Sequence, residues 1–154
     1  MNLLFDTNII LSIVRSNDSR GLIQLLNPHS SSIFISIASL AETKSIARQK
    51  RWGLNKQKRL NDFLEQVNTI DIDNLSMDTY AEIDSFSQLQ NPDFSEYSFQ
   101  TPRNMGKNDL WIASLASILG LQLVTTDADF DHLNGIFFEV RKIDQLEFLP
   151  FLKK

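Results

Sequence analysis

The sequence predicts an α/β protein, a three-layer α/β/α sandwich with a mostly parallel central sheet. Short apolar or β-branched runs of strand length alternate along the chain with longer segments of helical periodicity. Helices that connect strands act as the crossovers of a parallel sheet and cover both of its faces. At 154 residues, we expect a single domain over 1–154.

Strands are predicted where apolar and β-branched residues cluster over a few positions. Leu3–Phe5 is an apolar run that ends abruptly at Asp6, and Ile33–Ile37 is short and β-branched. Further strands are predicted over 69–72 and 121–125, with 137–140 as a candidate fifth strand.

Helices are predicted between these strands. Leu60, Phe63, Leu64 and Val67 follow the i, i+3, i+4, i+7 spacing of an amphipathic helix. Ser76 is the expected N-cap of a helix that extends to residue 89. The other helical segments are 9–14, 22–26, 39–52 before Gly53, and 108–119 before Gly120. The last of these is apolar around most of its circumference, so we expect it to be buried.

One long segment has no periodicity. Asn91–Met105 contains Pro92 and Pro102 together with many polar residues. It is predicted to be a long loop, and such loops in compact domains are often functional or mobile. Trp52 and Trp111, outside this segment, are interpreted as packing residues.

Composition excludes several functions. The chain has no cysteine, so disulfides and thiolate catalysis are excluded. No apolar run is long enough to span a bilayer, and no secretory signal pattern is present, so a cytoplasmic protein without membrane association is expected. The net charge of −4 argues against coating nucleic acid by bulk electrostatics. It does not exclude a nuclease, because a bound cation reverses the local field of an acidic site.

Acidic residues occur where strands end and helices begin. Asp6 and Asp127 follow the first and fourth predicted strands, Glu42 lies in the first turns of a helix, and Asp109 opens the buried helix. Ligands of open α/β sheets bind at the carboxyl ends of the strands. Clustered carboxylates raise one another's pKa unless a cation neutralises them, and hard oxygen ligands suit Mg²⁺ or Mn²⁺. The predicted chemistry is metal-assisted phosphodiester hydrolysis.

Each acid also has a structural explanation that the spacing leaves open. Asp6 and Asp127 could be helix N-caps, and Asp109 could be a first-turn acid favoured by the helix dipole. Glu42 could be an exposed helix acid. Asp129 is a further metal candidate, through water, and equally a solvated turn acid.

Polar neighbours of these acids are candidates for orienting carboxylates or water. They are Thr7, Asn8, Asn108 and Thr126. Asn8 could instead stabilise a turn, and Asn108 could cap the helix that carries Asp109.

Basic residues near the acids are candidate contacts for the phosphates of a nucleic acid. Lys44, Arg48 and Arg51 recur at i, i+4 and i+7 on the helix that carries Glu42 and could follow a phosphate backbone. Arg103 and Lys107 flank Asp109 and could hold a phosphate. A solvated helix face is the alternative for the first group.

Four segments in register resemble the motifs of the PIN domain family. They are LFDTNI over 4–9, SLAE over 39–42, GKNDLWIA over 106–113 and VTTDADF over 124–130. The resemblance covers essentially the whole chain and is greatest to VapC-type ribonuclease toxins of bacterial toxin–antitoxin pairs. It implies a metal-dependent endoribonuclease in which Asp6, Glu42, Asp109 and Asp127 hold Mg²⁺ or Mn²⁺ and direct a water at RNA. It also implies a cognate antitoxin and a homodimer.

Other functions find less support. A haloacid dehalogenase-type phosphotransferase requires a second aspartate where Asn8 stands, and His29 and His132 have no zinc or Ser-His-Asp spacing. An RNA-processing nuclease of the same fold, and a non-catalytic RNA- or protein-binding module, remain alternatives.

Overall fold

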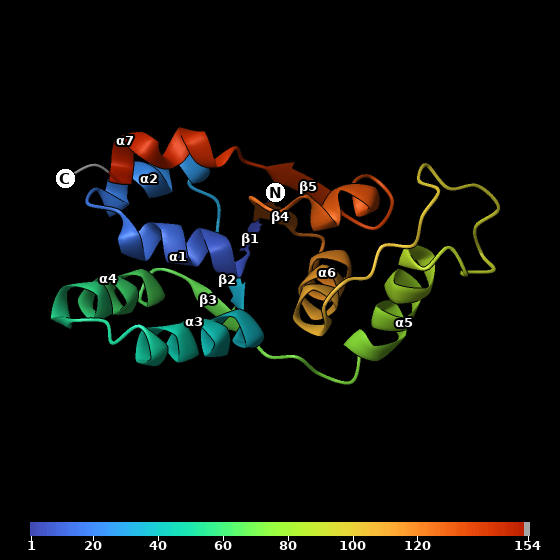
Figure 1. The fold of residues 1–154 in the computed structure, drawn as a ribbon, viewed down its shortest axis with the longest axis horizontal. Helices are drawn as coiled ribbons and strands as arrows, with labels where there is room; N and C mark the ends of the chain where they lie inside the picture. Colours follow the sequence, from blue (N-terminus) through green and yellow to red (C-terminus); the bar gives the residue numbers. More distant parts are fainter. Residues whose placement is uncertain (153–154) are drawn as a thin grey trace.

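A parallel sheet lies in the middle of the protein in the computed structural model, which describes residues 1–152 (Figure 1). Its strands are β1 (Leu3–Phe5), β2 (Ile33–Ser36), β3 (Asn68–Ile70), β4 (Gln122–Thr125) and β5 (Glu139–Lys142), in the order β3-β2-β1-β4-β5. Every pair in this sheet is parallel. Helices flank both faces, so the predicted α/β/α fold class is confirmed.

The helices divide between the two faces of the sheet. They are α1 (Thr7–Arg15), α2 (Ser19–Leu26), α3 (Ile37–Gln49), α4 (Leu54–Leu64), α5 (Ser76–Ser87), α6 (Lys107–Leu119) and α7 (Leu149–Leu152), with 3₁₀ helices η1 (Ala128–Leu133) and η2 (Gln145–Phe148). In Figure 1, α1 to α4 and α7 lie on one side of the sheet, and α5 and α6 lie on the other.

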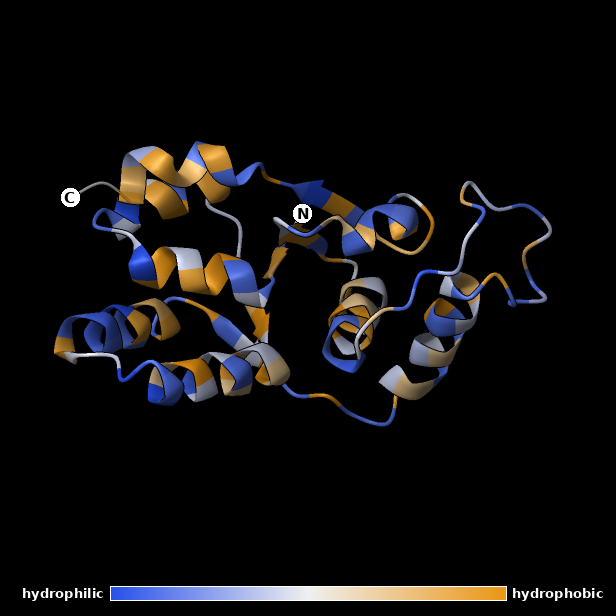
Figure 2. Cartoon of the chain, in the orientation of Figure 1, coloured by the Kyte–Doolittle hydropathy of each residue, from blue (hydrophilic) through white to orange (hydrophobic). Residues whose placement is uncertain are grey.

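Two apolar cores result from the alternation of side chains along the strands. Leu3 and Phe5 face the core that α1, α2 and α4 cover. Leu4, between them, faces the core that α5, α6 and η1 cover. Figure 2 shows the hydrophobic residues along β1 and α1 and the mostly hydrophilic outer surface of α4. β1 is therefore buried on both faces, as expected for a central parallel strand.

The boundaries of several elements differ from those predicted. β2 ends at Ser36, not Ile37, because the Ser36 hydroxyl accepts a hydrogen bond from the Ala38 amide and starts α3 two residues early. α3 ends at Gln49, and Trp52 lies beyond it, after Arg51 with a φ of 51°. Gly120, with a φ of 62°, ends α6 as predicted.

Other differences concern termini and strand registers. α4 ends before Val67, while Ser76 is inside α5 and Leu75 takes the cap position. Asn108 does not cap α6, because Gly106 does. β3 begins one residue earlier than the predicted third strand. β5 begins two residues later than the predicted fifth strand. The short helices η1, η2 and α7 were not predicted, since none is long enough to show helical periodicity.

The segment Asn91–Met105 contains no helix or strand, as predicted, but its aromatic residues are anchored. Phe94, Tyr97 and Phe99 pack around Phe86 of α5, with ring centroids 4.7, 5.1 and 5.5 Å away. Trp52 is buried in the core that contains α1, and the Trp111 ring lies 4.4 Å from that of Tyr80 at a tilt of 46°, so both tryptophans pack as interpreted. Within residues 1–152, no helix has the length and apolarity to cross a membrane.

Candidate metal centre

Asp6 lies at the junction of β1 and α1. Only 4% of its surface is exposed, and both carboxylate oxygens are bonded. Oδ1 accepts from the Thr7 amide at 2.7 Å, and Oδ2 accepts from the Thr125 hydroxyl at 2.8 Å. Burial raises the pKa of Asp6, while these two hydrogen bonds oppose the rise. Asp6 is thus both the N-cap of α1 and a carboxylate held at the end of the central strand.

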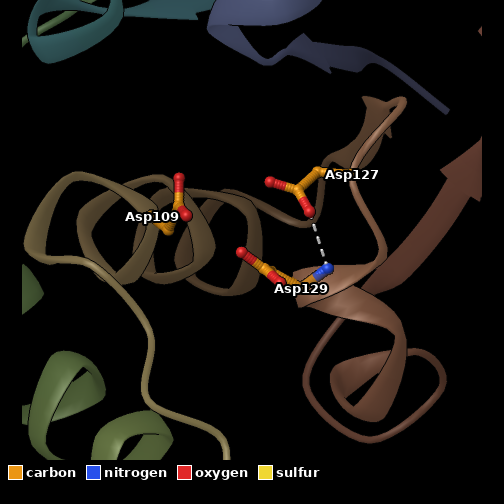
Figure 3. Close-up of side chains that lie close together, drawn as sticks. All are labelled: Asp109, Asp127 and Asp129. Atoms are coloured by element: carbon orange, nitrogen blue, oxygen red, sulfur yellow. Dashed lines mark hydrogen bonds between the residues drawn. The ribbon is translucent and has the colours of Figure 1, made fainter.

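Three aspartates converge at the same end of the sheet. Asp109 in the first turn of α6, Asp127 after β4 and Asp129 in η1 each offer a carboxylate oxygen within 4.8 Å of the others. Figure 3 shows the three side chains directed into one space between α6 and η1. We call this group the aspartate triad. It includes Asp129, for which the sequence had left two explanations open.

The local backbone explains the position of two triad members. The Asp127 amide donates to the Thr125 hydroxyl at 3.0 Å, and the Asp127 carboxylate accepts from the Asp129 amide at 2.9 Å (Figure 3). Thr125 therefore bonds to both Asp6 and Asp127. Sequence reasoning missed Thr125, although its place at the end of a buried strand beside Asp127 was a usable signal.

The triad is electrostatically strained. Burial is the largest of the causes that together raise the pKa of Asp109 to about 7; the others are the negative charges of Asp6, Asp127, Asp129 and Glu42. At neutral pH the side chain is then about half protonated in the absence of a cation. An arrangement of oxygen donors in which like charges repel is what a hard divalent cation stabilises.

Glu42 and Asp6 lie outside the triad but close to it. Both raise the pKa of Asp109 through their charge. The Glu42 carboxylate accepts from the Asn108 side chain at 3.2 Å, which links α3 to the start of α6. Of the four predicted ligands, the structure therefore groups Asp109 and Asp127 with Asp129, and it places Asp6 and Glu42 at the edge of that group.

The predicted polar neighbours take different places. Thr7 is buried and Thr126 is half-buried, and neither hydroxyl has a hydrogen-bond partner among the described residues. Asn8 is exposed and lines a surface pocket together with Thr126 and Leu149. Asn108 contacts Glu42, as described above. Thr7 and Thr126 thus have hydroxyls free to hold a water or a ligand.

The basic residues on α3 and just beyond its end do not face the triad. Lys44, Arg48 and Arg51 line a groove between α3 and α4 that also contains Trp52. At about 100° per residue, Lys44 and Arg48 lie roughly 200° and 240° around the helix from Glu42. This face of α3 therefore points away from the side that Glu42 presents to Asn108.

Two other basic residues lie nearer the start of α6. Lys107 is the exposed first residue of α6, two positions before Asp109. The Arg103 guanidinium lies 5.8 Å from the centre of the Phe99 ring, a cation–π distance. Of the two histidines, His29 is exposed and His132 is buried, and neither belongs to the triad.

Comparison with protein families agrees with the resemblance seen in the sequence. The family model described as the PIN domain matches residues 3–136. Comparison with curated proteins gives no match.

Several solved structures share the fold. VapBC2 from Rickettsia felis, bound to a DNA fragment from its promoter, has a TM-score of 0.70 at 24% identity, over 94% of this chain and 100% of that chain. DNA-bound VapBC from Salmonella typhimurium has a TM-score of 0.65 at 18% identity, over 92% and 98%. The sarcin–ricin loop cleaving toxin VapC20 from Mycobacterium tuberculosis has a TM-score of 0.52 at 17% identity, over 90% and 98%.

Proposed function

The chain belongs to the PIN domain family, and from this premise we propose that it is a Mg²⁺- or Mn²⁺-dependent endoribonuclease, the toxin of a type II toxin–antitoxin pair. The observation that carries the proposal is the aspartate triad, whose oxygens lie within 4.8 Å of one another at the carboxyl end of the sheet. Asp6 and Glu42 complete the acidic site, as the family resemblance implies.

The donor set fits a hard divalent cation. The triad supplies carboxylate oxygens alone, which suit Mg²⁺ and Mn²⁺ rather than a thiophilic metal. When bound, such an ion supplies a Lewis acid for a phosphoryl oxygen and lowers the pKa of water. Asp109 must release its proton for this, because its pKa of about 7 leaves it partly protonated at neutral pH.

The remaining residues would orient the reaction. Thr125 fixes the Asp6 carboxylate and the Asp127 amide relative to each other. Thr7 and Thr126 have buried hydroxyls able to hold a water beside the acids. Lys107 and Arg103, which precede Asp109, provide positive charge for phosphates next to the cleaved bond. Arg48, on the other face of α3, and Arg51, just beyond the end of α3, would contact more distant parts of the RNA.

RNA as the substrate and a toxin's role are supported by the fold of the similar proteins. VapC20 is a sarcin–ricin loop cleaving toxin, and the other two structures are VapBC assemblies bound to DNA. We infer by analogy an antitoxin partner, a homodimer and a cytoplasmic location. An RNA-processing nuclease of the same fold is the alternative, and a small antitoxin reading frame next to this one would favour the toxin.

The test is cleavage of RNA by the purified protein with and without Mg²⁺, beside Asp6→Asn and Asp109→Asn. Glu139→Gln is the matched control, because Glu139 is an exposed acid at the start of β5, at the opposite end of the sheet. We expect Mg²⁺-dependent cleavage by the wild type and the control only. Equal cleavage by all four proteins would contradict the mechanism. Metal binding without any cleavage would favour a non-catalytic module.

A further inference from the structure

A buried serine–histidine pair connects α5 to η1. Ser87, the last residue of α5, is fully buried, and its Oγ lies 2.7 Å from Nε2 of His132 in η1. The imidazole lies parallel to Phe86, with centroids 6.4 Å apart, and meets the edge of Phe99 at 5.1 Å. Its other nitrogen has no partner among the described residues. The pair is therefore enclosed by aromatic rings and is not accessible to a substrate.

Ser87 also holds the segment that leads into α6. Its carbonyl oxygen accepts from the Arg103 amide at 2.7 Å. Its hydroxyl lies 3.5 Å from Sδ of Met105. From Met105 the chain passes through Gly106 into α6, so Asp109 follows four residues later. One residue of α5 thus contacts both segments that supply the aspartate triad.

The geometry of the aspartate triad depends on a fixed separation between α6 and η1. Asp109 belongs to α6, whereas Asp127 is the N-cap of η1 and Asp129 lies in its first turn, so a relative shift of these two elements would change the distances between the three carboxylates. Their repulsion favours that shift when no cation is bound. A binding site must be held to about 0.5 Å by its supporting residues. η1 is a 3₁₀ helix of six residues, and the hydrogen-bond geometry within a 3₁₀ helix is poorer than within an α-helix.

His132 is suited to a buried hydrogen bond. Burial, helped by the charge of Arg103, lowers the pKa of His132 to about 4, although Asp131 and the backbone of Asp129 act in the opposite direction. The imidazole is therefore neutral at neutral pH and can share one proton with the Ser87 hydroxyl.

We propose that the Ser87–His132 pair is a positioning device that sets the separation between Asp109 and the other two members of the triad. The inference rests on the proposed function, since it assigns the pair a role in metal binding. Neither side chain belongs to the aspartate triad; both act through α6 and η1.

The test compares Ser87→Ala and His132→Leu with His132→Gln, which keeps a polar atom near the position of Nε2. Ser16→Ala is the matched control. Ser16 is equally buried and accepts from the Asp18 amide at 2.9 Å, but it lies at the far end of α1. Mn²⁺ binding is measured by calorimetry, and hydrogen exchange is measured on the metal-free proteins.

We expect Ser87→Ala and His132→Leu to weaken Mn²⁺ binding by about 10-fold, the lower end for residues that support metal ligands. The double variant should lose no more than either single variant, because both remove one hydrogen bond. His132→Gln should recover part of the affinity. Amides of residues 103–109 and 128–133 should exchange faster in Ser87→Ala but not in Ser16→Ala.

Two results separate this proposal from the proposed function. If the wild type binds no Mn²⁺, the proposed function fails, and hydrogen exchange still decides whether the pair ties the two segments. If the wild type binds Mn²⁺ and Ser87→Ala binds it equally well, the positioning role is overturned. Unchanged exchange in either segment overturns it as well.

Discussion

The two sides of η1 are built on opposite principles. On one side lies the aspartate triad, in which like charges are held together and the pKa of Asp109 rises to about 7. On the other side lies an aromatic cluster in which the rings contact one another and His132 is hydrogen-bonded to Ser87. The rings of the cluster are Phe86, Phe94, Tyr97, Phe99, Phe137 and the imidazole of His132.

The difference shows how a strained site is kept in place. Repelling carboxylates destabilise the metal-free fold, so the elements that carry them must be held by other contacts. Phe130 and Leu133 of η1 are fully buried, and His132 adds the connection to α5. The aromatic cluster thus stabilises the fold next to the aspartate triad, whose repulsion destabilises it.

The largest effect on activity should come from a substitution in the aspartate triad. Asp109→Asn removes a triad carboxylate, and RNA cleavage should fall on the order of 10³-fold, equivalent to about 4 kcal/mol of lost transition-state stabilisation. The metal-free variant should melt at a higher temperature than the wild type, because one source of repulsion is gone. Cleavage assays and thermal unfolding in a chelator measure both results. A variant that is inactive and also less stable would contradict the idea that the site strains the fold.

A substitution in the aromatic cluster is expected to lower the stability of the metal-free protein, not to raise it. Phe86 is 2% exposed and contacts five of the other rings, so Phe86→Ala should lower the free energy of unfolding by about 3–5 kcal/mol. Denaturation with urea measures the loss. Phe151→Ala, at a half-buried ring outside the cluster, is the control and should lose less. Equal losses for the two would mean that the aromatic cluster is no special source of stability.

The sequence predicted the fold because its signals were local. The apolar strand Leu3–Phe5, the helical stripe beginning at Leu60 and the Gly120 terminator each act over a few residues. The boundaries that differ lie at Ser36 and Gly106, which take the cap positions of α3 and α6, and helix ends are the positions least determined by periodicity.

The site was only partly predictable, since its contacts are long-range. Asp6 and Thr125 are 119 residues apart in the sequence, and Ser87 and His132 are 45 apart. Spacing placed the acids at one end of the sheet, but it could not show that Asp129 joins Asp109 and Asp127. Nothing in the sequence marked His132, because a single histidine has no pattern.

The two sides should also respond oppositely to pH. The folded pKa of Asp109 is raised above its unfolded value, so its contribution to stability falls as the pH rises from about 4 to 7. The folded pKa of His132 is lowered, so its contribution is lost as the pH falls from about 6.5 to 4.

The pH dependence due to Asp109 can be separated from that of the other groups by comparing the wild type with Asp109→Asn. Subtracting the unfolding free energy of Asp109→Asn from that of the wild type, both metal-free, should give a curve that declines between pH 4 and 7. Mn²⁺ affinity of the wild type should rise about tenfold per pH unit below 7 and level off above it, because binding displaces one proton. A flat difference curve with pH-independent binding would show that Asp109 is already ionised without metal.

The smallest effect should come from the exposed contact of η1. Lys142 of β5 and Asp131 form an ion pair of 2.7 Å, but their side chains are 45% and 41% exposed. Solvent screening limits such pairs to about 0.5 kcal/mol, so Lys142→Met should barely change the free energy of urea unfolding or the Mn²⁺ affinity. Added salt should abolish what difference remains. A loss of Mn²⁺ affinity as large as that of Ser87→Ala would mean that the surface ion pair, rather than the buried aromatic side, holds η1 against the repulsion of the triad.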